Sequence, residues 1–388
     1  MMYLRKLLKQ IEKSPKSLLL LGPRQTGKST LLNKLTPDMV IDLSDESEFL
    51  RFASQAELLQ RIIDAEKPKR VLIDEVQRIP SLLNTIQHIL DRGRIKPQFL
   101  LSGSSARKLR RGQANLLPGR ILTYQMSPLT LEEINYDFDL ETVLATGFLP
   151  GVFTESSPQL RKKILRSYAS IYLKEEIQAE ALTKNIEGFS RFLMIAAAKS
   201  GEFLDFAKLG SQANITQKTA TRFFEILEDT LIVFRVEAFA HSEINRLIRK
   251  PKYYFFDPGV LNGLLGNFTI SGDRRGSIFE SFFISQVVNL IHSHDASVRL
   301  SSYRTESGSE VDLILELENQ VMAIELKAST NVGKSDLRGL KGFSQNYKKK
   351  HECIVVYLGG RKQVIDGITI LPLIEAYKKI ALAIKKGW

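Results

Sequence analysis

The sequence predicts an α/β protein, and three observations lead to that fold class. An apolar run at residues 17–21 leads into a glycine-containing loop and then a helical segment, which is the strand–loop–helix order of a P-loop. A second apolar run, at residues 70–73, ends in two acids. In the last third of the chain, strands at residues 310–317 and 320–328 carry carboxylates and a lysine. Phosphate chemistry is therefore expected at both ends of the chain.

The composition is that of a globular protein, and its net charge favours an anionic partner. The chain has 388 residues, of which 43% are hydrophobic and 25% are charged, so two or three domains are expected. The formal net charge of +12 favours a partner such as nucleic acid or a membrane surface. A basic protein with a solvated surface is the alternative.

The cysteine count and the N-terminus narrow the class of protein further. The single cysteine, Cys353, excludes an internal disulfide framework and a cysteine-based zinc cluster. Residues 1–16 lack the apolar core of a signal peptide, and no apolar stretch reaches the roughly 18–20 residues that span a bilayer. The sequence therefore predicts a cytoplasmic protein with no membrane partner.

Residues 22–29 predict a site for ATP and Mg²⁺. The glycines of this loop let the backbone approach the phosphates, and amide groups at the start of the following helix donate to them. Lys28 would neutralise the charge of the β- and γ-phosphates, and the Ser29 hydroxyl would ligate Mg²⁺. The predicted nucleotide-binding residues of this segment are Gly22, Pro23, Arg24, Gln25, Thr26, Gly27, Lys28, Ser29 and Thr30.

Two later strands predict the rest of a hydrolytic site. Asp74 would hold Mg²⁺ through water, and Glu75 would polarise the attacking water. The strand at residues 98–104 ends in small polar residues. Of these, Ser102 and Ser104 fall where an ATPase of this type places a sensor of the γ-phosphate. The combined site predicts ATP hydrolysis.

The middle of the chain predicts a helix-turn-helix with the spacing of a winged helix. Residues 206–213 and 217–229 form the two helices, and the strand at residues 231–236 leads into a wing. The polar side of the second helix carries residue types that contact DNA. These predicted DNA-binding residues are Gln217, Lys218, Thr221 and Arg222. A winged helix that packs within the protein and never touches DNA is the alternative.

The last third predicts a metal site. Residues two apart on a strand share a face, so Glu325 and Lys327 point to the same side, and a neighbouring strand can place Asp312 beside them. Two carboxylates and a lysine can hold Mg²⁺ and activate water for attack on a phosphodiester. Glu310, two residues before Asp312, adds a further negative charge. A surface ion pair between Glu325 and Lys327 is the alternative.

Further motifs carry a resemblance to a known family. Residues 15–135 resemble the AAA+ ATPases of bacteria and archaea that have a C-terminal domain of unknown function. Leu-Pro-Gly-Arg at residues 117–120 and Ser-Pro-Leu-Thr-Leu-Glu-Glu at 127–133 are similar to the Gly-Arg and Pro-Leu-Ser-x-x-Glu motifs of that family. Gly-Phe-Leu-Pro at residues 147–150 resembles its Gly-Gly-x-Pro, with Thr146 in place of the first glycine. The resemblance covers nearly the whole chain.

This resemblance implies a role for an arginine. In such ATPases an arginine often reaches the γ-phosphate bound by a neighbouring subunit and stabilises charge in the transition state. Arg120 is the expected residue, with Arg110 and Arg111 as rivals, and a homo-oligomer such as a hexamer is then expected. A surface arginine that pairs with a carboxylate is the alternative for Arg120.

The C-terminal strands resemble the PD-(D/E)xK nucleases, including the Holliday-junction resolvases. The spacing from Asp312 to Glu325 and the triplet Glu-Leu-Lys at residues 325–327 carry this resemblance. Glu280, on the preceding helix, matches the position of an additional metal-site acid. The resemblance implies a restriction-endonuclease-like α/β domain in which Glu280, Asp312 and Glu325 hold Mg²⁺ and Lys327 assists. A nuclease fold that binds DNA or a partner without cutting is the alternative.

These features together predict three modules. They are a P-loop AAA+ core at residues 1–135, a helical lid and winged helix at 136–250, and a nuclease-like domain at 251–388. The leading expectation is an ATPase that acts on branched or structured DNA and cuts it with Mg²⁺. Two alternatives stay open: a nucleotide-switched scaffold that binds DNA or protein without cutting, and a motor that remodels branched DNA.

Overall fold

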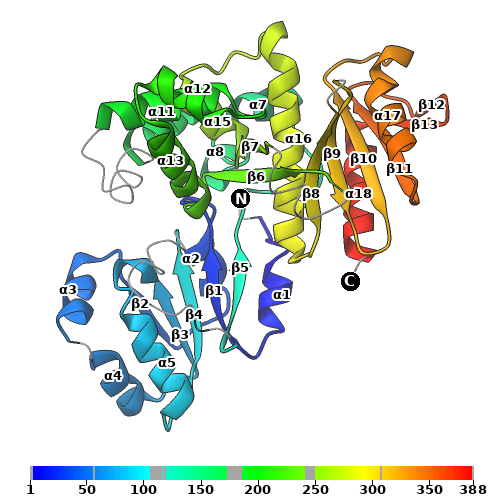
Figure 1. Ribbon diagram of the computed structural model, residues 1–388. Coiled ribbons are helices and arrows are strands. Elements are labelled where there is room, and N and C mark those ends of the chain that lie inside the picture. The colour runs from blue at the N-terminus through cyan, green and yellow to red at the C-terminus, as the bar shows by residue number, and fades with distance from the viewer. Residues whose placement is uncertain are drawn as a thin grey trace. The chain divides into compact units, whose positions relative to one another are not determined.

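The described part of the chain folds into two compact units (Figure 1). The computed structural model describes residues 3–55, 57–104, 117, 119–172, 186–240, 250–305 and 308–386. The first unit comprises Met1–Leu129 with Glu225–Ile232 and His292–Asp295, and the second comprises Thr130–Phe224, Val233–Ile291 and Ala296–Trp388.

The first unit is built on a sheet of five strands in the order β2-β3-β4-β1-β5. Every neighbouring pair in this sheet runs parallel. The parallel sheet and its helices (Figure 1) confirm the predicted α/β class. The strands are β1 (Ser17–Leu21), β2 (Met39–Asp42), β3 (Arg70–Asp74), β4 (Gln98–Gly103) and β5 (Ile121–Gln125).

Burial on both faces explains why these short apolar runs form parallel strands. All five residues of β1 are buried. Leu19 and Leu21 belong to the core on one face of the sheet, which also includes side chains of α3, α4 and α5. Leu18 and Leu20 belong to the core on the other face, with side chains of α1 and α2. The helices are α1 (Leu8–Glu12), α2 (Lys28–Asn33), α3 (Glu46–Ser54), α4 (Leu58–Glu66) and α5 (Leu82–Arg92).

The second unit contains a sheet of eight strands in the order β12-β13-β11-β10-β9-β8-β6-β7. β6, which the sequence predicted to lead into a wing, pairs antiparallel with β7 and parallel with β8. The predicted middle and C-terminal modules therefore share one sheet. The strands are β6 (Val233–Ala238), β7 (Lys252–Phe255), β8 (Arg299–Arg304), β9 (Glu310–Glu316), β10 (Val321–Lys327), β11 (His351–Tyr357), β12 (Gln363–Ile365) and β13 (Ile368–Pro372).

Helices accompany this sheet along the chain (Figure 1). α17 packs on β9, β10 and β11 through Leu340 and Phe343, while α18 contacts β11 and β13. The main helices are α7 (Leu140–Thr146), α8 (Pro150–Phe153), α9 (Pro158–Ser167), α11 (Ile186–Ala198), α15 (Pro258–Leu265), α16 (Gly272–His294), α17 (Arg338–Asn346) and α18 (Leu373–Lys386).

Two further helices, α12 (Phe206–Ala213) and α13 (Gln217–Asp229), are joined by a three-residue turn. Asn214 ends α12 in the left-handed region with φ of 56°, a conformation that asparagine tolerates better than most residues. Gly210 permits the close turn, because a Cβ there would lie 2.9 Å from the carbonyl oxygen of Ile215. The two helices follow the predicted boundaries, and the assignment as a winged helix stays a prediction.

A buried carboxylate fastens the start of α15 to the loop that precedes α8. Asp257 is 1% exposed and accepts hydrogen bonds from the backbone N–H groups of Val260 at 3.0 Å and Phe148 at 2.7 Å. Gly147, with φ of 67°, has no room for a side chain because the Asp257 carboxylate lies against it. Burial raises the pKa of Asp257 to about 6, although these backbone hydrogen bonds lower it.

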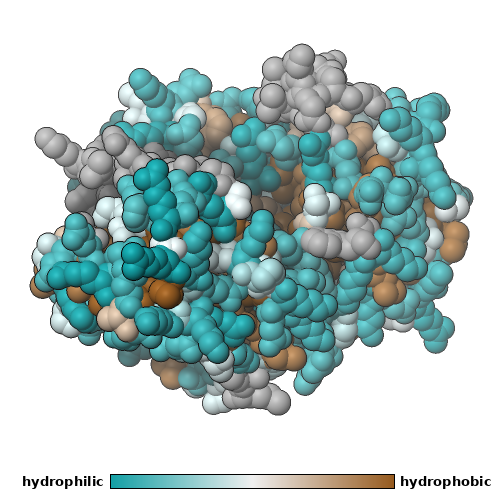
Figure 2. All heavy atoms as spheres, turned by 90° about the horizontal axis from the view of Figure 1, so that it is seen from below, coloured by the Kyte–Doolittle hydropathy of each residue, from teal (hydrophilic) through white to brown (hydrophobic). Residues whose placement is uncertain are grey.

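The surface is mainly hydrophilic on the face that Figure 2 shows, where hydrophobic residues form small separate groups. Eight large hydrophobic side chains are exposed in the described residues, and they are scattered along the chain from Leu4 to Leu382. Within the described ranges, no helix is both long enough and apolar enough to cross a membrane.

We predict that the contribution of Asp257 to stability falls as the pH rises. Its pKa is about 6 in the folded protein against an ordinary value of 3.8, so the folded state binds the proton more tightly. This contribution is full below the ordinary value and is lost as the pH rises through about 6. The difference in free energy of unfolding between wild type and Asp257→Asn, measured by urea denaturation, should therefore shrink across this window.

Asp139→Asn is the matched control for that measurement. Asp139 also caps a helix, but it is exposed and hydrogen bonds from Thr142 lower its pKa. The contribution of Asp139 to stability is present above its ordinary pKa and is lost as the pH falls through the lowered pKa. The prediction is wrong if the difference in free energy of unfolding between wild type and Asp257→Asn stays constant or grows as the pH rises across this window.

Candidate functional site

The loop between β1 and α2 has the backbone that a phosphate site requires. Gly27 has φ of 92°, a conformation that side chains disfavour and glycine adopts freely. Gly22 lies directly against the backbone of Met126, so a Cβ there has no room. The loop conformation therefore favours glycine at position 27, and the contact with Met126 requires it at position 22.

The polar side chains of this loop are tied to its own backbone. Lys28 is 5% exposed, and its Nζ donates to the carbonyl oxygens of Gly22 at 2.9 Å and Pro23 at 3.1 Å. The Thr26 hydroxyl donates to the Pro23 carbonyl at 2.8 Å. Arg5, which sequence reasoning missed, donates to the carbonyl oxygen of Thr26 at 2.7 Å. The loop is thus held in shape by contacts from within and from the N-terminal segment.

The remaining predicted residues of the loop are more accessible. Arg24, Gln25 and Thr30 are exposed, and Ser29 is half-buried at the start of α2. Gln25 adopts φ of 62° at the tip of the loop. These four side chains are therefore at least partly accessible to solvent.

Asp74 is the last residue of β3, and Glu75 follows it at the carboxyl edge of the sheet. The Ser102 hydroxyl, from the neighbouring β4, donates to Asp74 Oδ1. The backbone N–H of Glu75 donates to Ser102 Oγ at 3.2 Å, and Glu75 itself adopts φ of 54°. The structure therefore brings three predicted residues into one hydrogen-bonded group.

Gln77, which sequence reasoning also missed, connects this group to the end of β4. It is 4% exposed, and its Nε2 donates to the Glu75 carboxylate and, at 3.0 Å, to Ser104 Oγ. Its Oε1 is buried without a hydrogen-bond partner. The motif Asp-Glu-Val-Gln at residues 74–77 was the signal available in the sequence, because an amide two residues after Glu75 can reach its carboxylate.

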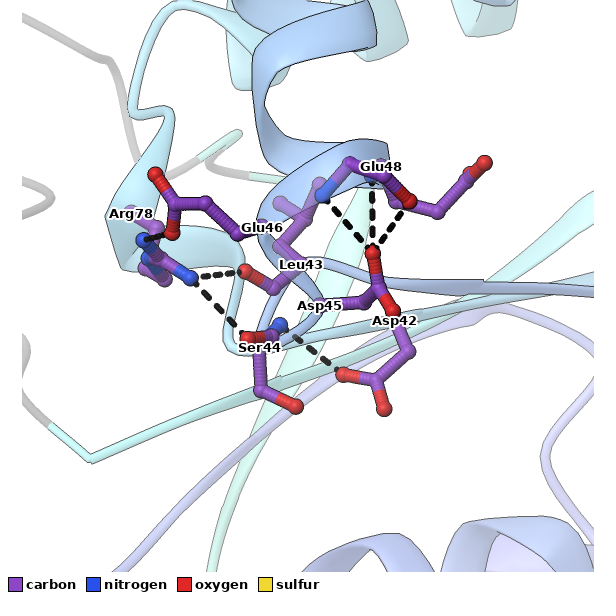
Figure 3. Close-up of polar contacts among 8 residues, drawn as sticks. Asp42, Leu43, Ser44, Asp45, Glu46, Glu48 and Arg78 are labelled. Atoms are coloured by element: carbon purple, nitrogen blue, oxygen red, sulfur yellow. Dashed lines mark hydrogen bonds and ion pairs between the residues drawn. The ribbon is translucent and has the colours of Figure 1, made fainter.

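Arg78 anchors the other side of the same turn (Figure 3). Its guanidinium donates to the carbonyl oxygens of Leu43 at 2.6 Å and Ser44 at 3.2 Å. It also forms an ion pair with Glu46 at 2.7 Å and lies 4.3 Å from the ring centroid of Phe49. The segment that follows Glu75 is thus fixed to the loop after β2 and to the start of α3.

Arg120 pairs with a carboxylate in this structure. It forms two hydrogen bonds with Asp91, of 2.6 Å from Nε and 2.9 Å from Nη2. The hydrogen bonds lower the pKa of Asp91 and raise that of Arg120. The arginine is about one-third exposed, so a role at a neighbouring subunit stays a prediction. Its rivals, Arg110 and Arg111, lie outside the described residues.

In the second unit, the strand register places Asp312 opposite Glu325. β9 and β10 run antiparallel and pair Leu313 with Ile324, so the next position along each strand is Asp312 and Glu325. Directly opposite residues share a face of the sheet. Lys327 Nζ donates to Glu325 Oε1 at 2.9 Å. The predicted pair of acids and their lysine therefore lie at one edge of this ladder.

Burial changes the pKa values of both acids, Asp312 and Glu325. Burial raises the pKa of Asp312 well above its ordinary value, and the negative charges of Glu325 and Glu280 raise it further. Burial also raises the pKa of Glu325, although Lys327 opposes this shift. Glu325 Oε2 is buried without a hydrogen-bond partner. An additional positive charge between these two carboxylates would lower the pKa of both.

Glu280 is held by two other residues, which sequence reasoning missed. Lys252 Nζ lies 3.2 Å from Glu280 Oε1 and 2.8 Å from Glu310 Oε1, and the Tyr254 hydroxyl donates to Glu280 Oε1 at 2.6 Å. Both side chains come from β7. No local pattern in the sequence marked them, because the contact joins segments that are distant along the chain.

The residues fit Mg²⁺ as a site of two carboxylates and not of three. Within the described part of the chain, no group of three or more histidine, cysteine, aspartate or glutamate side chains could hold a metal ion. The predicted set of Glu280, Asp312 and Glu325 does not form such a group, although the charge of Glu280 raises the pKa of both other acids. Magnesium commonly binds through one or two carboxylates and keeps several waters, which Asp312 and Glu325 can satisfy.

The predicted DNA-binding residues lie at the start of α13. Gln217, Lys218 and Arg222 are exposed. Thr221 is half-buried, and its hydroxyl donates to the carbonyl oxygen of Gln217 at 3.1 Å. Three of the four side chains are thus accessible to a partner, while Thr221 uses its hydroxyl within the helix.

Comparison with known families finds three matches along the chain. Residues 14–135 match the model of the AAA domain. Residues 137–271 match a domain of unknown function (DUF8612), and residues 275–376 match another domain of unknown function (DUF4143).

Two relatives and two solved structures are similar to this chain. Uncharacterised proteins of Mycobacterium bovis and Mycobacterium tuberculosis are each 27% identical over 319 residues, which cover 80% of this chain and 70% of the relative. Among solved structures, the replication initiator DnaA bound to AMPPCP and single-stranded DNA has 12% identity and a TM-score of 0.26, over 57% of this chain and 86% of that one. A protein from Vibrio cholerae has 11% identity and a TM-score of 0.24, over 96% and 98%.

At these TM-scores, neither solved structure supports a conclusion about fold or function. The family match stands on its own and agrees with the parallel sheet and the loop between β1 and α2. Residues 14–135 are therefore similar to an AAA domain.

Proposed function

We propose that the chain hydrolyses ATP at the first site and acts on branched or structured DNA, which it cuts at the second site with Mg²⁺. The hydrogen-bonded group of Asp74, Glu75, Ser102 and Gln77 carries the first half of this proposal. It stands after a phosphate loop within the part of the chain that matches the AAA domain. The second half is carried by the buried pair Asp312 and Glu325 with Lys327.

At the ATP site, the protein residues have separate tasks. Lys28 exchanges its bonds to the loop carbonyls for the phosphate oxygens and neutralises their charge. Ser29 and Asp74 would hold the Mg²⁺ ion, which supplies further neutralisation of the phosphates when it is bound. Glu75 accepts the proton of the attacking water. Ser102 orients Asp74 and also accepts from the Glu75 backbone.

At the C-terminal site, Asp312 and Glu325 would hold one Mg²⁺ ion. Such an ion polarises a phosphodiester oxygen and lowers the pKa of a bound water. Lys327 lies beside Glu325 and would orient the water or offset the charge that develops on the phosphate. The formal net charge of +12 and the exposed Gln217, Lys218 and Arg222 support a nucleic-acid partner.

The second candidate is a nucleotide-switched protein that binds DNA or a partner without cutting. One observation favours it: within the described residues, the three acids expected of a nuclease do not form a group that could hold a metal ion. A motor that remodels branched DNA without cutting it is the third candidate. Divalent-dependent cleavage separates the first proposal from both others.

We predict that Lys28→Ala lowers ATP turnover by about a hundredfold or more, because a cation that stabilises phosphate charge is lost. Turnover is measured by phosphate release from the full-length protein. Lys34→Ala is the control, since Lys34 follows α2 on the same segment and has no predicted task. Equal turnover in Lys28→Ala and wild type would refute the role of the loop in hydrolysis.

We predict that Gln77→Leu lowers the turnover number for ATP by about tenfold, the effect of one lost hydrogen bond of roughly 1.4 kcal/mol. ATP affinity should change little, because Gln77 contacts Glu75 and Ser104 and not the phosphate loop. Gln60→Leu is the matched control, since Gln60 also has a buried Oε1 without a partner but bonds to Asp64 on α4. A loss of affinity at unchanged turnover would contradict this role.

We predict that Mg²⁺-dependent cleavage of DNA disappears in Lys327→Ala. Linear, single-stranded and four-way-junction substrates are compared with and without ATP, and the substrate that is cut fastest reveals the preferred DNA shape. Lys334→Ala is the control, because Lys334 is 79% exposed in the same unit. If the wild-type protein cuts none of these substrates but still hydrolyses ATP, the nucleotide-switched binding protein becomes the favoured function.

A further inference from the structure

We propose that Lys252 is a permanent internal cation of the carboxylate cluster, and that it limits the cluster to one divalent ion. The inference rests on the proposed function of Asp312 and Glu325 as the ligands of that ion. It adds a residue, Lys252, which neither the motif nor the predicted metal set contains. The cluster is defined here as Glu280, Glu310, Asp312 and Glu325 together with Lys252 and Lys327.

The first observation is that Lys252 is buried among carboxylates. Its side chain is 4% exposed, against 22% for Glu280 and 34% for Glu310. One ammonium group contacts both acids, at 3.2 and 2.8 Å. A charge so deeply buried is tolerated only when it is paired. Lys252 therefore holds Glu280 and Glu310 in a fixed relation to each other.

The second observation is that Lys252 has little freedom to leave this position. Its Nζ lies 5.1 Å from the ring centroid of Phe203, a cation–π distance, and its backbone forms a bridge with Phe203. Lys252 also lies at the start of β7, which pairs with β6. Although burial lowers its pKa, the charges of Glu280 and Glu310 raise the pKa above the ordinary value of 10.5.

The third observation is the division of the cluster into two halves. Lys252 and Tyr254 both bind Oε1 of Glu280. Asp312 lies at the register position opposite Glu325 and accepts a hydrogen bond from the Leu326 N–H at 2.8 Å, while Glu325 keeps a buried Oε2 without a hydrogen-bond partner. A second divalent ion would need Glu280 or Glu310 as a ligand, and the Lys252 ammonium already contacts Oε1 of both. The half at Asp312 is thus the one that accepts an ion.

Lys252 supplies a positive charge inside the cluster at Glu280 and Glu310. The other ammonium group, Lys327, lies beside Glu325 and 3.9 Å from Asp336. Without Lys252, a single ion would leave a buried negative charge, and a second ion would become favourable at the site that the ammonium group had occupied.

The test counts Mn²⁺ ions bound to the full-length protein without nucleotide, by titration calorimetry and by the electron paramagnetic resonance of free Mn²⁺. Ions that belong to the cluster are those lost when Asp312→Asn and Glu280→Gln are combined in the same background. We expect one such ion in wild type and two in Lys252→Met. Lys252→Gln, which keeps a donor for the carboxylates but not the charge, should also bind two. Lys250→Met is the control, because Lys250 is 61% exposed and pairs with Asp205.

A second readout follows folding instead of binding. Lys252→Met should melt at a lower temperature than wild type in EDTA, and Mn²⁺ should raise its melting temperature more than that of wild type, because the ion replaces the missing charge. Glu280→Gln in the Lys252→Met background removes a ligand of the second ion and should return the count to one.

The outcomes separate this inference from the function on which it rests. One ion in wild type and one in both Lys252 variants would overturn the inference and leave the metal site at Asp312 and Glu325 intact. Two ions in wild type would overturn it without any variant. No ion lost in Asp312→Asn would refute the metal site and, with it, the role of Lys252.

Discussion

Parallel pairing of β1, β3 and β4 is the constraint on which the proposed ATP site depends. Strands that run in one direction end at the same edge of a sheet, and loops at that edge commonly bind ligands. The register pairs Leu20 with Ser102 and Ile73 with Leu101, which brings Ser102 next to Asp74. A slip of one residue in β4 would turn Ser102 to the opposite face and break the bonds to Asp74 and Glu75. Burial of both faces of the sheet holds this register.

The sequence allowed the parts of the structure that depend on local patterns to be predicted. Neighbouring residues, glycine positions and apolar runs predict the loop at residues 22–29, the two acids at the end of β3 and the boundaries of α12 and α13. Gln77 was missed although it lies two residues after Glu75, because its hydrogen bond goes to Ser104, which follows another strand, β4. Arg78 was missed for the same reason, since its partners follow β2.

The tertiary contacts of the second unit could not be predicted from such local patterns. Lys252 and Glu280 are 28 positions apart, and nothing in the run Lys-Tyr-Tyr-Phe suggests a buried ammonium. The predicted separation of a middle and a C-terminal module also missed that β6 pairs with β7 and β8. An ion pair as buried as Lys252 with Glu280 and Glu310 seldom adds stability over an apolar replacement. Its presence is therefore better understood through the charge that it supplies.

The position of β6 has a consequence for how the protein is made. A ribosome delivers residues 233–238 well before residues 299–304, so β6 emerges before its parallel partner β8 exists. Until then, one edge of β6 has unpaired backbone groups that can recruit strands from other chains. A nascent chain halted near residue 250 would lack β7 as well and leave both edges open. Expression of the middle segment alone therefore invites aggregation, even though its helices form from local sequence.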